Sequence, residues 1–107
     1  MENESFFVKA LGSTPLIKVL DFLIENRIFD YSKTDIARET GISRATLDSF
    51  WGNLVELELV KPTRVIGRAT LYKLNINSDS VKKMVEFDLA LSKSYANGII
   101  EKVKAVA

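Results

Sequence analysis

The sequence of 107 residues contains no cysteine and no histidine. Without cysteine, the chain cannot form a disulfide, a thiolate metal site or a cysteine nucleophile. Without histidine, it lacks the commonest general base and the commonest metal ligand. We therefore expect no bound metal and no cofactor. The lack of disulfides also fits a reducing compartment, so we expect a cytoplasmic protein.

Long apolar runs are missing as well. No stretch approaches the length that crosses a bilayer, and residues 1–5 are polar and acidic rather than signal-like. We therefore expect no membrane partner. The hydrophobic fraction of 47% and the charged fraction of 27% are ordinary for a globular protein. The length favours one domain.

The chain has no large excess of either charge. Lysine and arginine number 15 against 14 acidic residues, for a net charge of +1. If the protein binds nucleic acid, its positive charge must be gathered on one face. Paired carboxylates, phosphate-binding glycine loops and nucleophile constellations do not occur at convincing spacing, so the sequence indicates a protein that is not an enzyme.

The few glycines and prolines stand at predicted element boundaries. Residues 6–11 form a short apolar segment of one or two helical turns that Gly12 ends. Thr14 and Pro15 then predict a helix start, and apolar spacing carries this helix to residue 26 or 27. Residues 28–31 are too short for a helix and are interpreted as an edge strand.

The next segment predicts two short helices joined by a tight turn. Ser32 caps the first, Ile36 and Ala37 face inward, and Gly41 ends it. Ser43 caps the second, over residues 44–57, with an inner face of Leu47, Phe50, Leu54 and Leu57. We expect Trp51 to pack against the wing or the neighbouring helix. The outward residues are then Arg44, Thr46, Asp48, Ser49 and Asn53. This is a helix-turn-helix arrangement.

Residues 59–66 and 70–76 predict a β-hairpin that turns at Gly67 and Arg68. The hairpin is basic, with Lys61, Arg64, Arg68 and Lys73, and residues 61–78 contain no acid. A basic hairpin directly after a recognition helix is suited to DNA phosphates or the adjacent minor groove. The charge segregation that DNA binding requires is thus visible in the sequence.

Ser78 and Asp79 predict the start of a last helix that runs almost to the C-terminus, about 40 Å long. Its apolar arc is wider than packing on one domain requires, so a second partner is expected. The expected dimer interface consists of Met84, Phe87, Leu91, Tyr95 and Ile99.

The stretches 42–47, 54–64 and 67–75, together with 7–15, resemble winged-helix transcription regulators of the ArsR/MarR type. They read ISRATL, LVELELVKPTR, GRATLYKLN and FVKALGSTP. The resemblance covers roughly residues 7–76 and is greatest to archaeal and archaeal-virus members. It implies a homodimer that binds double-stranded operator DNA and usually represses transcription.

The resemblance also implies site residues. The recognition-helix contacts would be Ser43, Arg44, Thr46, Ser49 and Asn53, with Arg64 and Arg68 in the wing and Lys33 and Thr34 at the DNA backbone. Metal sensing by Cys or His ligands is excluded because the chain has neither. Asp48 also departs from the family, which often has a basic residue there. An acid at this position repels phosphate unless it pairs with Arg44 or accepts from a cytosine amine.

The predicted fold is mostly α with a small β-hairpin (α+β): a winged helix-turn-helix with a long C-terminal dimerisation helix. Residues 1–77 would form the DNA-binding domain, and residues 78–107 the dimerisation helix packed on it. Two alternatives stay open: a protein-interaction module in a larger transcription or replication assembly, and nonspecific chromatin packing. The sequence identifies no small-molecule effector.

Overall fold

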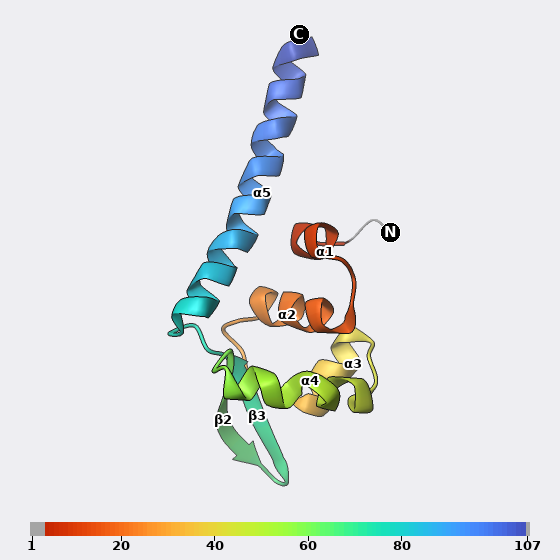
Figure 1. Cartoon of the computed structure of the whole chain (residues 1–107), viewed down its shortest axis with the longest axis vertical. Coiled ribbons are helices and arrows are strands. Elements are labelled where there is room, and N and C mark those ends of the chain that lie inside the picture. Colours follow the sequence, from red (N-terminus) through yellow and green to blue (C-terminus); the bar gives the residue numbers. More distant parts are fainter. Residues whose placement is uncertain (1–3, 107) are drawn as a thin grey trace.

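The computed structural model describes the backbone of residues 4–106 and the side chains of residues 4–98. Five helices and three strands form in these residues, which confirms the predicted α+β class. Their order is α1 (Phe6–Leu11), α2 (Pro15–Glu25), β1 (Tyr31–Ser32), α3 (Lys33–Thr40), α4 (Arg44–Glu56), β2 (Val60–Ile66), β3 (Ala69–Leu74) and α5 (Asp79–Val106). The molecule measures 59 × 29 × 21 Å, with the β2–β3 hairpin and the far end of α5 at opposite ends (Figure 1).

Hydroxyl side chains start the helices where the sequence predicted. Thr14 accepts a hydrogen bond from the Ile17 amide at 3.3 Å, directly before Pro15. Ser32 and Ser43 cap α3 and α4 in the same way, each accepting from the amide three residues ahead. Such caps satisfy amides that have no partner within the helix. The starts of the helices are therefore fixed by local chemistry.

The turn between α3 and α4 depends on Gly41. Its φ of 75° places it in the left-handed region, which glycine adopts without steric penalty. The following amide, that of Ile42, donates to the Ala37 carbonyl at 3.1 Å and closes the turn. Ser43 can then cap α4 at once, so the two helices are joined as predicted.

The core lies between the helices and the small sheet. Val19, Leu23 and Ile24 from α2 meet Ile36 from α3, and Leu47 and Leu54 from α4 complete the layer. Val60, Leu74 and Val81 seal the side toward the sheet and the start of α5. Trp51 is buried and meets the Tyr72 ring edge-on at a centroid distance of 5.2 Å, which confirms that it packs on the wing.

The three strands form an antiparallel sheet in the order β1-β3-β2. The predicted hairpin is confirmed as β2 and β3, with Gly67 at its turn. The edge strand is shifted from 28–31 to Tyr31–Ser32, where Tyr31 pairs with Tyr72. The register of β2 slips between Pro62 and Arg64, so Thr63 is the extra residue of a β-bulge.

One predicted core position is wrong. Leu57 does not belong to the inner face of α4, since it is 66% exposed. The helix already ends at Glu56, and Glu58 takes a left-handed φ of 59°. This turn directs the chain into β2, with the Leu59 amide bonded to the Leu54 carbonyl, and leaves Leu57 outside.

Candidate nucleic-acid interface

The outward face of α4 carries a row of short polar side chains. Ser43 donates from its hydroxyl to Thr46 Oγ1 at 2.8 Å, and Ser49 donates to the Thr46 carbonyl at 2.5 Å. Asn53 follows one turn later and is exposed. Because a hydroxyl oxygen has two acceptor lone pairs, these internal bonds leave the row able to accept hydrogen bonds. The row is accessible from solvent, as the sequence predicted.

Arg44 and Lys33 are brought together by the helix-turn-helix packing. Arg44 Nη1 donates to Thr34 Oγ1 at 2.8 Å, which links the first turns of α3 and α4. Lys33 Nζ lies 3.1 Å from Asp48 Oδ1, and Arg44 Nε lies 3.7 Å from the same oxygen. Three of the predicted DNA-binding residues therefore share one cluster with Asp48.

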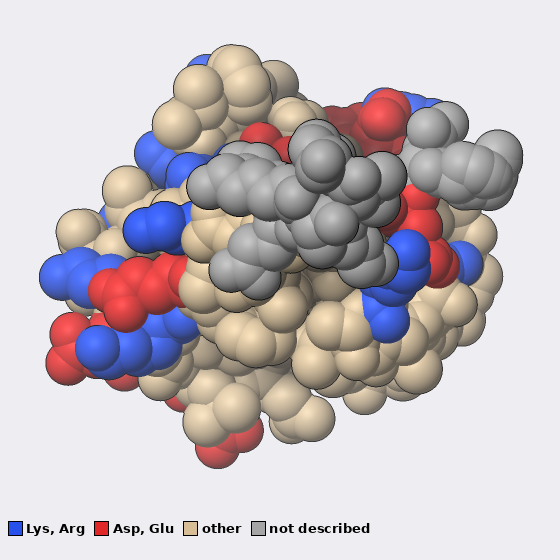
Figure 2. All heavy atoms as spheres, turned by 90° about the horizontal axis from the view of Figure 1, so that it is seen from above, with Lys and Arg blue, Asp and Glu red and all other residues tan. Residues whose placement is uncertain are grey.

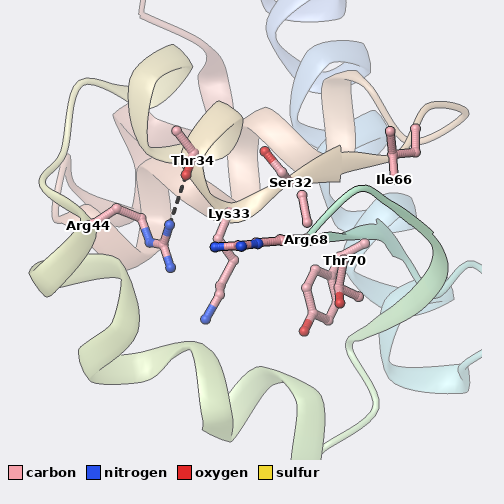
Figure 3. Close-up of a pocket in the computed structure, with 9 residues that line it drawn as sticks. Ser32, Lys33, Thr34, Arg44, Ile66, Arg68 and Thr70 are labelled. Carbon is pink, nitrogen blue, oxygen red and sulfur yellow. Dashed lines mark hydrogen bonds between the residues drawn. The ribbon is translucent and has the colours of Figure 1, made fainter.

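An open groove of about 520 Å³ lies between this cluster and the wing. Its cations come from three elements: Lys33 from α3, Arg44 from α4 and Arg68 from the hairpin turn. Figure 3 shows these three side chains reaching toward one space, and Ser32, Thr34 and Thr70 also line it. No acidic residue of the described chain lines this groove. A phosphate is the ligand that such a wall favours, since it accepts hydrogen bonds and carries negative charge.

Arg64, the second predicted wing contact, lies elsewhere. Its guanidinium makes two bonds to Asp30, with Nε 3.0 Å from Oδ2 and Nη2 3.1 Å from Oδ1. Thr63 donates to the same carboxylate at 2.5 Å. The hydrogen bonds from Arg64 and then Thr63 lower the pKa of Asp30 below its ordinary 3.8, and the Asp30 carboxylate raises the pKa of Arg64. Contact of Arg64 with DNA stays a prediction.

The residues expected at a dimer interface lie along α5. Phe87 meets the Phe7 ring edge-on at 6.2 Å, and Tyr95 lies 4.5 Å from the Phe6 ring, so α1 covers part of this stripe. Met84 packs against the core, and Leu91 is half-buried. Tyr95 nevertheless stays 51% exposed. The side chain of Ile99 lies outside the described residues.

The surface around α5 differs from the groove in charge. Figure 2, which looks down on this end of the molecule, shows basic and acidic side chains interspersed with uncharged areas. Among the helices that the structure describes, none combines the length and apolar character required to cross a membrane.

The sequence did not predict two of the groove residues as ligand contacts. Ser32 was interpreted only as a helix cap, and Thr70 only as a strand residue, yet both line the groove. The signal for Thr70 was its position at the start of β3, two residues after Arg68 of the hairpin turn. Asp30 carried no local signal, since its partner Arg64 is distant in the chain.

Comparison with solved structures identifies the fold. The chain is similar to MepR, a transcription regulator of the Staphylococcus aureus multidrug efflux pump MepA, with a TM-score of 0.64 and 17% identity over 89% of this chain and 69% of MepR. It is also similar to the adhesin competence repressor AdcR of Streptococcus pyogenes, with a TM-score of 0.59 and 17% identity over 92% and 72% of the two chains.

A mutant of ZitR from Lactococcus lactis matches with a TM-score of 0.58 and 19% identity over 78% of this chain. The chain spans 57% of the length of that protein. These similarities show that the chain has an α+β winged-helix fold with a long C-terminal helix. No family model matches the sequence, and no curated protein matches it.

Proposed function

We propose that this protein is a sequence-specific double-stranded DNA-binding transcription regulator that acts as a repressor and binds an inverted-repeat operator as a homodimer. Residues 1–77 would contact the DNA, and residues 78–107 would pair two copies. The fold supports a regulator, and the solved neighbours include a protein named as a repressor. An archaeal source stays a prediction of the sequence resemblance.

The observation that carries the proposal is the convergence of Lys33, Arg44 and Arg68 on one open groove. The groove adjoins the accessible polar row of α4. Placed in a major groove, α4 would present Ser49 and Asn53 to base edges. The three cations would then hold the phosphates beside it, and Arg68 would reach the next minor groove.

The length of α5 supports the proposed dimer. Its 28 residues extend roughly 42 Å, well beyond the helices that it packs against (Figure 1). Pairing through this helix would set two copies of α4 about 34–36 Å apart, one turn of DNA. A two-fold dimer of this kind reads an inverted repeat.

Selection of bound duplexes from a random pool, followed by titration, tests the proposal. We expect an enriched inverted repeat that binds at least about 1,000-fold tighter than random duplex at physiological salt. Asn53→Ala should reduce discrimination at one half-site position by about 1–3 kcal/mol. Lys83→Ala, an exposed change on α5 remote from the groove, is the matched control and should leave binding unchanged.

Two outcomes would contradict the proposal. Uniform binding to all duplexes with a steep salt dependence would favour nonspecific packing of DNA. A stable monomer that binds no duplex would favour the protein-interaction module, with α5 docking on a different protein.

A further inference from the structure

Asp48 is an acid on the outward face of the proposed recognition helix. Its side chain is 48% exposed, so a duplex seated on α4 would meet it directly. An acid at this place opposes the binding of any duplex, because DNA carries one negative charge per roughly 1.7 Å of helix axis. Its contacts show what it does in the free protein.

The Asp48 carboxylate contacts two of the three groove cations. Oδ1 lies 3.1 Å from Lys33 Nζ and 3.7 Å from Arg44 Nε. Arg44 is also held from its other side, since Nη1 donates to Thr34 Oγ1. Asp48 thus partly neutralises both cations, whereas Arg68, on the hairpin turn, makes no ion pair within the described residues.

We propose that Asp48 is a specificity-determining residue that suppresses binding to arbitrary DNA, an inference that rests on the proposed function. On a random duplex, phosphates must compete with Asp48 for Lys33 and Arg44, and the carboxylate repels them. On the operator, the same carboxylate accepts a hydrogen bond from a cytosine N4 amine, which offsets the repulsion. Other major-groove edges that present only acceptors do not offset it.

The substitution Asp48→Asn tests this inference because it keeps the shape and removes the charge. The matched control is Glu56→Gln, which changes the net charge equally at the far end of the same helix, where Glu56 is exposed. Fluorescence anisotropy measures binding of both variants and the wild type to a random duplex and to the selected operator between 50 and 200 mM salt.

For Asp48→Asn we expect the affinity for random duplex to rise about 3- to 10-fold, and its salt slope to steepen by about 1–2 as Lys33 and Arg44 become free for phosphates. Discrimination between operator and random duplex should fall by at least about fivefold. Glu56→Gln should leave all three quantities unchanged. Lys33→Ala should weaken random-duplex binding more in the Asp48→Asn background than in the wild type.

Unchanged or weaker binding of Asp48→Asn to random duplex overturns the inference, as does an equal gain in Glu56→Gln. Binding of the wild-type protein to the operator and to random duplex tests the proposed function separately. If the wild type prefers its operator and Asp48→Asn behaves identically, the function stands and the role of Asp48 fails. If neither protein binds any duplex, both fail.

Discussion

At the scale of single residues, the wing is anchored by an ion pair between distant parts of the chain. The β-bulge at Thr63 turns both Thr63 and Arg64 toward Asp30, which lies just before β1. Two parallel N–H···O bonds give the pair a defined geometry, although Arg64 is largely exposed. Arg64 thus holds the hairpin in place, and Arg68 is the arginine that reaches the groove.

This difference between the two arginines predicts different binding defects. Arg68→Ala should reduce the salt slope by about 1, because it removes a phosphate contact. Arg64→Ala and Asp30→Asn should each weaken operator binding by about two- to fivefold, the range of an exposed ion pair, with little change in slope. The double variant should be no worse than either single variant, as titrations over a salt series would show.

If Arg64 instead contacts phosphate, Arg64→Ala alone would lower the salt slope by about 1 and Asp30→Asn would tighten binding. That pattern would contradict the anchoring role.

The same pair predicts a pH dependence. The pKa of Asp30 lies below its ordinary 3.8, mainly through the Arg64 and Thr63 hydrogen bonds. A carboxyl whose folded pKa is lowered stabilises the fold above its unfolded pKa, and this contribution is lost as the pH falls through the folded value. The anchor should therefore stay intact at neutral pH and open in strong acid. Carbon-detected NMR titration should show the pKa of Asp30 rising toward 3.8 in Arg64→Ala.

At the scale of elements, α4 is held against the sheet by Trp51, which is only 3% exposed. Trp51→Ala should destabilise the protein by about 3–5 kcal/mol, since it opens a cavity under the recognition helix. Trp51→Phe should have a smaller effect, about 1–2 kcal/mol, because the indole Nε1 has no hydrogen-bond partner in the described structure.

Urea unfolding followed by circular dichroism measures both changes. If Trp51→Phe destabilised the protein as much as Trp51→Ala, a smaller aromatic ring would not replace the packing of the indole. That result would contradict the prediction.

At the scale of the whole molecule, the proposed dimer can be separated from DNA contact. Tyr95 is half exposed on α5, where its ring meets that of Phe6 from α1. Tyr95→Arg should convert a dimer of two 12.0 kDa chains into monomers in light scattering. Operator affinity should fall about 100-fold, because the two half-sites are no longer linked. Lys83→Ala serves again as the control on the same helix.

A wild-type protein that is already monomeric at assay concentrations would contradict this prediction. So would a Tyr95→Arg variant that stays dimeric and binds a single half-site as tightly as the complete operator.

Much of the fold was predictable because it depends on neighbours in the chain. Thr14, Ser32 and Ser43 each bond an amide three residues away, and Gly41 ends α3 through its own φ. The hairpin turn at Gly67 is equally local. Part of the candidate site was predictable for the same reason, because helical spacing on α4 places Arg44 and the polar row on its outward face.

The sequence by itself thus determined the helix starts, the turn, the hairpin and the outward row of α4, because short-range hydrogen bonds and periodicity decide them. Only the tertiary structure decided which charges meet. Asp30 lies 34 residues from Arg64, and Lys33 lies 15 residues from Asp48. Such pairs depend on how β1 joins the sheet and how α3 packs on α4, and no local pattern encodes that geometry.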